Sequence, residues 1–84
     1  MSERKIGDVT HYYNHLHVAI VAITDGELHL GDTLHFEGHT SDFVQRIASM
    51  ELDHQAVEVA KKGDIVGIST NEHAREHDTV YIVH

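Results

Sequence analysis

Histidine is the residue type with the greatest capacity for chemistry in this sequence, because ten of its 84 residues are histidines and imidazole titrates near neutral pH. The segment His73-Ala74-Arg75-Glu76-His77 matches the H-x-x-E-H pattern of zinc-dependent peptidases. In that pattern a helix places two imidazoles one turn apart, and the carboxylate acts as the base. Here the surrounding segment, 71–78, is short, charged and typical of a loop. We therefore expect no zinc-dependent catalysis at this segment.

A second pair of histidines, His15 and His17, is separated by one residue. Side chains at positions i and i+2 of a strand lie on the same face, so these two imidazoles are the candidate metal ligands of the chain. A specific site needs further ligands in a fixed geometry, and the sequence identifies none for this pair. We predict adventitious metal binding at His15 and His17 and no physiological metal site.

Other catalytic patterns are absent from the sequence. It contains no G-x-S-x-G nucleophile motif, no dinucleotide-binding glycine motif and no phosphate-binding loop. The segment Lys62-Gly63-Asp64 lacks the Ser or Thr and the upstream glycine that a phosphate loop requires. We therefore expect a protein that is not an enzyme and has no cofactor.

The charge of the chain bears on its partners, because 14 acidic and 6 basic residues give a formal net charge of −8. Nucleic-acid binding relies on cationic side chains that neutralise phosphates, so this charge opposes it. The chain has no cysteine, which fits a reducing compartment, and no apolar run long enough to span a membrane. We expect one soluble, cytoplasmic domain over residues 1–84, with a flexible N-terminus at residues 1–4 and no membrane partner.

Short apolar segments bounded by turn residues predict strands along most of the chain. The expected strands are 5–13, 18–24, 33–37, 43–52, 64–70 and 79–83. Asp25-Gly26, Gly31-Asp32 and Gly63-Asp64 mark turns between them. Residues 55–62 have the apolar spacing of a short helical turn. Leu34 and Phe36 share one face of their strand.

Two of these strands have unusual patterns. Residues 18–23 are apolar on both faces, which indicates either a face covered by another segment or an exposed partner surface that also includes Tyr12 and Tyr13. In residues 43–52 the apolar side chains change parity, from Phe43 and Ile47 to Met50 and Leu52. A β-bulge near Ala48-Ser49 would bring both sets to one face. Together the strands predict an all-β fold, a small closed antiparallel β-barrel of about six strands.

The order of these features resembles domain 2 of translational GTPases of the elongation factor Tu type. The resemblance covers about residues 9–83 and is carried by Asp25-Gly26-Glu27-Leu28, Gly31-Asp32, Met50-Glu51-Leu52 and the segment 62–68, Lys-Gly-Asp-Ile-Val-Gly-Ile. Similar barrels also occur as C-terminal domains of U32-type peptidases. The GTPase domain is absent, so no GTP is expected.

The resemblance implies a binding module of the translation apparatus, with the ribosome, tRNA or a translation-related protein as the partner. Glu51 corresponds to a Glu that contacts the terminal adenosine of tRNA in that family, and His54 stands where the family has an Arg. The candidate residues for nucleic-acid or partner binding are Glu51, His54, Arg46, Lys61, Lys62, Tyr12 and Tyr13. The alternative is a protein-interaction or self-assembling barrel unrelated to translation, which includes a homo-oligomer.

Overall fold

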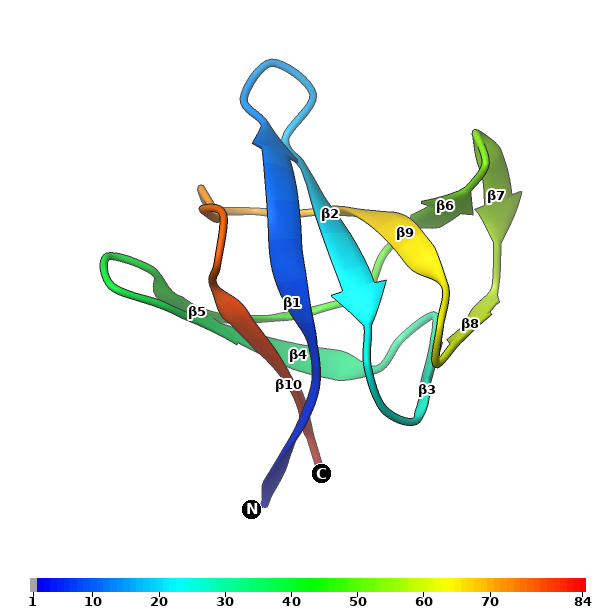
Figure 1. Ribbon diagram of the computed structural model, residues 1–84, viewed down its shortest axis with the longest axis horizontal. Helices are drawn as coiled ribbons and strands as arrows, with labels where there is room; N and C mark the ends of the chain where they lie inside the picture. Colours follow the sequence, from blue (N-terminus) through cyan, green and yellow to red (C-terminus); the bar gives the residue numbers. More distant parts are fainter. Residues whose placement is uncertain (1) are drawn as a thin grey trace.

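The computed structural model describes residues 2–84, and within them the chain forms ten strands and no helix (Figure 1). The strands are β1 (Glu3–Tyr13), β2 (Val18–Ile23), β3 (Glu27–His29), β4 (Thr33–Glu37), β5 (Asp42–Arg46), β6 (Met50–Leu52), β7 (Gln55–Val57), β8 (Val59–Lys61), β9 (Ile65–Ser69) and β10 (Thr79–Val83). The prediction of an all-β fold is confirmed. The helical turn predicted at residues 55–62 is wrong, because β7 and β8 occupy that segment.

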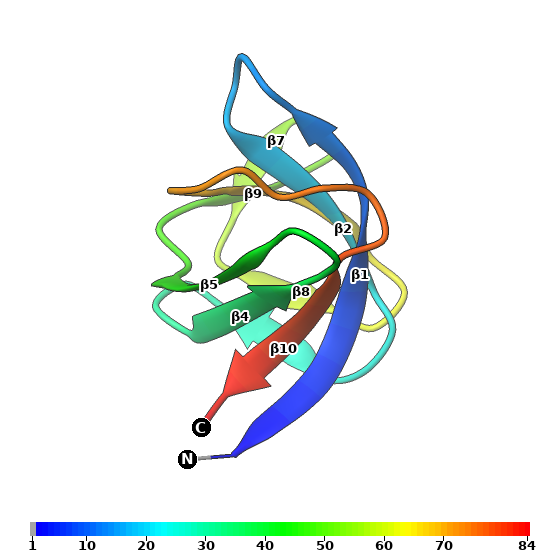
Figure 2. The same ribbon diagram turned by 90° about the vertical axis from the view of Figure 1, so that its left-hand side faces the viewer.

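Eight strands form one antiparallel sheet in the order β5-β4-β10-β1-β2-β9-β6-β7, and β3 pairs with β8 in a separate ribbon. Figures 1 and 2 show that the large sheet curls around the interior and that the two chain ends lie side by side. The predicted closed barrel of six strands is not confirmed. Within residues 2–84, β5 and β7 are the edges of the large sheet, so its ladder of backbone hydrogen bonds does not close.

The long strand β1 holds the two halves of the large sheet together. Its first half pairs with β10 and its second half with β2, and a register shift interrupts each pairing. Such irregularities increase the local twist of a strand, which lets β1 bend across the molecule. Of the four terminal residues expected to be flexible, Glu3 and Arg4 lie in β1, opposite Val83 and Ile82. Met1 lies outside the described residues.

The core is built from the alternating side chains of the strands. In β2 the residues Ala19, Val21 and Ile23 are buried, whereas the residues between them are half-buried on the outer face. Leu34 and Phe36 share the inner face of β4, as predicted, and the ring of Phe36 stacks on Phe43 at 4.8 Å. The period of two therefore fixes which side chains fill the interior and which reach the surface.

The segment predicted as one strand with a bulge is instead two strands with a break. Its two sets of apolar residues do face inward, because Phe43, Ile47 and Met50 are all buried. The parity change occurs at residues 47–49, where the chain leaves the pairing of β5 with β4 and joins β9 through β6. A bulge would keep one strand pairing, whereas this break moves the chain to another part of the sheet.

The turns at residues 29–32 and 61–64, which contain Gly31 and Gly63, share one geometry. Gly31 and Gly63 have φ of 90° and 95°, a region that glycine enters without the steric cost of a Cβ. In each turn the aspartate carboxylate accepts the backbone N–H three residues earlier, from His29 to Asp32 at 2.9 Å and from Lys61 to Asp64 at 2.8 Å. The predicted turns at these Gly-Asp steps are therefore confirmed.

Candidate functional site

A shallow apolar hollow lies on the outer face of β2 and β9 and has a volume of about 350 Å³. Large apolar side chains are seldom left exposed together on a soluble protein without a partner. Three of the strongly exposed ones gather here, with exposed fractions of 67% for Leu16, 60% for Ile65 and 46% for Tyr13. We call this surface the apolar hollow; it is lined by Tyr13, Leu16, Val18, Ile20, Glu51, Asp53, His54, Ile65, Val66 and Gly67.

The strand register explains why the hollow has a floor and walls. Ile20 of β2, Gly67 of β9 and Glu51 of β6 lie opposite one another in a row across three strands. Gly67 forms the floor of the hollow because it has no side chain. A Cβ at this position would lie only 3.2 Å from Cγ1 of Val18 and 3.5 Å from Cδ1 of Ile20. A side chain at position 67 would therefore occupy the space of the hollow.

The rim of the apolar hollow is acidic on one side. Glu51 is the last outward residue of the row, and Asp53 and His54 form the tight turn between β6 and β7. Both turn residues have positive φ, 52° and 64°, as the two central residues of a type I′ hairpin turn do. The lining contains no Lys or Arg. An apolar floor beside carboxylates is suited to a ligand that combines apolar and basic groups.

Three of the seven predicted binding residues come together at the apolar hollow, namely Tyr13, Glu51 and His54. Tyr12 points to the other face of β1, where it packs against the core and lies 4.5 Å from the ring of His73. The predicted cationic positions are elsewhere. Arg46 donates from Nε to the carbonyl of Gly31 at 3.1 Å. Lys61 and Lys62 are exposed at the end of β8 and in the turn after it.

Sequence reasoning missed Leu16, Asp53, Ile65 and Gly67 as lining residues. Ile65 and Gly67 have the outward parity of β9, so their position on the surface follows from the buried Val66 and Ile68. Leu16 is an apolar residue inside the polar turn 14–17. An apolar residue in a turn, next to a strand that is apolar on both faces, was the available signal for this surface.

The H-x-x-E-H segment is a turn of the same kind as the Gly-Asp turns. The N–H of Arg75 donates to the carboxylate of Asp78 at 2.8 Å, and His77 takes the position of the glycine with φ of 75°. His73 packs against Tyr12 instead of facing His77 as a fellow ligand on a helix. The segment therefore lacks the helix on which the H-x-x-E-H pattern places its two imidazoles.

The pair His15 and His17 lies in the turn between β1 and β2, where both residues are exposed. The premise that they share a strand face is wrong, because neither belongs to a strand and His17 has φ of 55°. In residues 2–84 neither imidazole joins two further potential ligands.

The described chain also contains no helix that could cross a bilayer.

The structure describes a small all-β domain with a hollow on the outer face of β2 and β9. No protein-family model matches the chain. It is 38% identical over 80 residues to an uncharacterized protease of Methanocaldococcus jannaschii, covering 94% of this chain and 19% of that protein. It is 34% identical over 77 residues to a collagenase of Porphyromonas gingivalis, covering 90% of this chain and 21% of the collagenase. The chain thus spans about a fifth of the length of these curated relatives.

Solved structures agree with this fold. The C-terminal domain of a candidate U32 peptidase from Geobacillus thermoleovorans superposes with a TM-score of 0.86 at 18% identity, covering 94% of this chain and 91% of that one. The selenomethionine variant of that domain gives a TM-score of 0.85 at 19% identity, covering 92% and 96%. At this identity the likeness establishes the shared fold.

The identification with domain 2 of elongation factor Tu-type GTPases is wrong, and so is the translation function drawn from it. The similar proteins are named as a protease and a collagenase, and the similar structures are C-terminal domains of a U32-type peptidase. The motifs misled because Gly-Asp turns and alternating strands specify local backbone geometry, which unrelated small β domains share. The ribosome and tRNA followed only from that resemblance, so no argument for them remains.

Proposed function

We infer that this chain is a non-catalytic binding domain of a peptidase-type protein and that its apolar hollow docks an extended polypeptide segment. The observation that carries this inference is the exposure of Leu16, Ile65 and Tyr13 around one hollow of about 350 Å³. Burial of such side chains by a partner is favourable by about 25 cal/mol per Å² of apolar surface. The occupant is a stretch of a protein substrate, presented to a catalytic domain elsewhere.

The chemistry of the hollow favours a polypeptide with apolar and basic side chains. Glu51 and Asp53 lie on its rim, no Lys or Arg is among its lining residues, and the whole chain has a formal charge of −8. These charges repel phosphates and attract Lys and Arg. The curated relatives support a peptidase setting, since one is named a protease and another a collagenase.

A pair of synthetic peptides tests this function. Both are blocked heptapeptides, one alternating leucine with lysine and the other leucine with glutamate. We expect the lysine peptide to bind at least about tenfold more tightly, because only its charge complements the rim. Two-dimensional NMR of the labelled chain should show the largest shifts at Tyr13, Ile65 and Gly67.

Three outcomes would contradict the proposal. Equal binding of the two peptides, or shifts spread over β4 and β5, would mean that the hollow does not select the ligand. A mass of two copies in light scattering, with Ile65 protected and no response to either peptide, would assign this face to self-association instead. The peptidase setting is tested separately, by asking whether the intact protein that carries the domain cleaves lysine-rich substrates less well without it.

A further inference from the structure

A second cluster of side chains lies on the outer face of β4 and its neighbours, away from the apolar hollow. The ring of His35 lies between two carboxylates: Nδ1 is 2.9 Å from both carboxylate oxygens of Glu3, and Nε2 is 2.6 Å from Oδ1 of Asp42. Two hydrogen bonds raise the pKa of His35 above its usual value, and the bond to Glu3 has a larger effect than the bond to Asp42. The His35 side chain is 13% exposed, so its ring has a fixed orientation.

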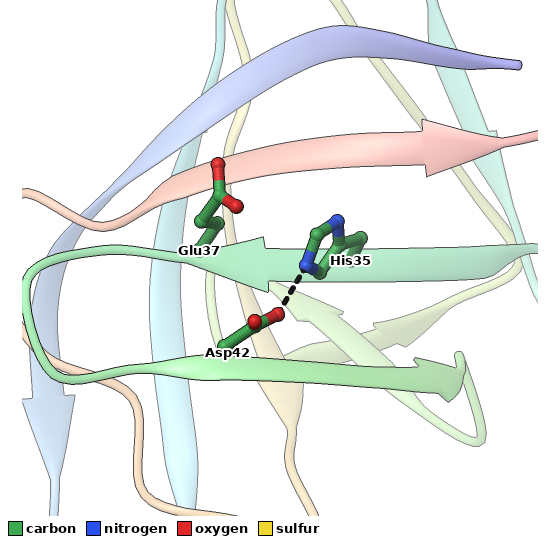
Figure 3. A group of neighbouring side chains, drawn as sticks. All are labelled: His35, Glu37 and Asp42. Carbon is green, nitrogen blue, oxygen red and sulfur yellow. Dashed lines mark hydrogen bonds and ion pairs between the residues drawn. The ribbon is translucent and has the colours of Figure 1, made fainter.

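A third carboxylate, that of Glu37, lies near the His35 imidazole and the Asp42 carboxylate. Glu37 and Asp42 are directly opposite in the β4–β5 register, a position at which like charges destabilise a sheet. One donor atom from each of His35, Glu37 and Asp42 lies within 4.8 Å of the other two (Figure 3). Within residues 2–84 no Lys or Arg forms an ion pair with these three residues. The cluster therefore holds more negative charge than one imidazolium can neutralise.

The space beside the cluster is open and polar. A hollow of about 600 Å³ at the β4–β5 turn is lined by Glu37, Asp42, Ser41 and Thr79, among others. Ser41 is only 5% exposed, and its hydroxyl has no hydrogen-bond partner among the described residues. A buried hydroxyl without a partner is unfavourable.

We propose that Nε2 of His35 and the carboxylates of Glu37 and Asp42 bind a divalent transition metal ion. Imidazole and carboxylate are ligands of zinc, and a site of three protein ligands leaves positions for water. Glu3 would orient the ring through Nδ1 of His35, because a histidine that binds a metal usually donates its other N–H to a carboxylate. The ion would neutralise the negative charges of Glu37 and Asp42, which face each other across β4 and β5, and would link the two strands.

Zinc titration by calorimetry tests the site on the whole chain. The ion must displace the proton from Nε2, so the titration is run at pH 8. Glu37→Gln is the informative variant, because Glu37 is exposed and, among residues 2–84, takes no part in the hydrogen bonds of His35. We expect this variant to weaken the tightest zinc-binding event by at least about tenfold, and His35→Gln to remove it.

His29→Gln is the matched control. His29 is an exposed histidine on β3 with a carboxylate, that of Glu27, 3.3 Å from its Nε2, and within residues 2–84 no third potential ligand joins them. Its replacement should leave the tightest event unchanged, and NMR should show the His35 ring signals moving at the first equivalent of zinc. If Glu37→Gln binds zinc like the native chain, or if His29→Gln weakens binding as much, zinc is held adventitiously and the proposal is wrong.

Discussion

At the scale of single residues, His77 shows how a sequence motif can be overruled by the backbone. It occupies the position that Gly31 and Gly63 hold in the two equivalent turns, with φ of 75°. A residue with a Cβ in this region is strained by about 1–2 kcal/mol. Its N–H donates to the carbonyl of Val9 at 2.8 Å, which holds the strained turn against β1.

Replacing His77 with glycine should therefore stabilise the protein. The gain is smaller than the full strain, because glycine also loses more backbone entropy on folding, so we expect about 0.5–1 kcal/mol. Urea denaturation followed by circular dichroism measures it. His77→Ala keeps the Cβ and the strain, so it should give no gain. A glycine variant no more stable than the alanine variant would show that the position is unstrained.

At the scale of elements, the gap between β5 and the chain after β9 is bridged by one side chain. The amide of Gln45 is buried, donates from Nε2 to the carbonyl of Ser69 at 2.9 Å and accepts the N–H of Asn71 through Oε1 at 2.7 Å. These side-chain bonds link the edge strand β5 to the end of β9, with which β5 forms no backbone ladder among residues 2–84. A buried amide that links two segments is expected to matter more than an exposed hydrogen bond.

Gln45→Ala should lower the free energy of unfolding by about 1–3 kcal/mol, because it leaves the carbonyl of Ser69 and the N–H of Asn71 without their partner. The midpoint of urea denaturation reports this change. Gln55, the other glutamine, is exposed on β7, and Gln55→Ala should change stability by less than about 0.5 kcal/mol. Equal midpoints for the two variants would mean that Gln45 does not join the two segments.

The strands could be predicted better than their arrangement. Alternation identified the shared inner face of Leu34 and Phe36 in β4, and the Gly-Asp steps marked turns, since both are local properties of the chain. The break at residues 47–49 and the bridge by Gln45 depend on contacts between segments far apart in sequence. No local pattern distinguishes that break from a bulge.

The candidate site was predictable in part for the same reason. Tyr13 and Glu51 were selected by separate arguments, and the pairing of β1, β2, β9 and β6 brings them to one hollow. The cluster at His35 joins side chains from β1, β4 and β5. Its residues are scattered among ten histidines and 14 acidic residues, so their spacing carried no metal-ligand pattern.

At the scale of the whole molecule, the fold provides a small platform with different surfaces on different faces. The apolar hollow lies over β2 and β9, whereas the His35 cluster lies over β4 and β5. Its curated relatives are about five times as long as the region they share with this chain. This arrangement suits a domain that contributes binding while catalysis takes place elsewhere, as we infer for the apolar hollow.

Binding of the leucine–lysine heptapeptide to two matched variants tests that central claim most directly. Ile65 and Val44 are both exposed apolar residues, at 60% and 56%, but only Ile65 lines the apolar hollow. Ile65→Ser should weaken the peptide at least about fivefold, a loss of roughly 1 kcal/mol of apolar contact, while Val44→Ser binds it like the native chain. Equal affinities in the two variants would contradict docking at the apolar hollow.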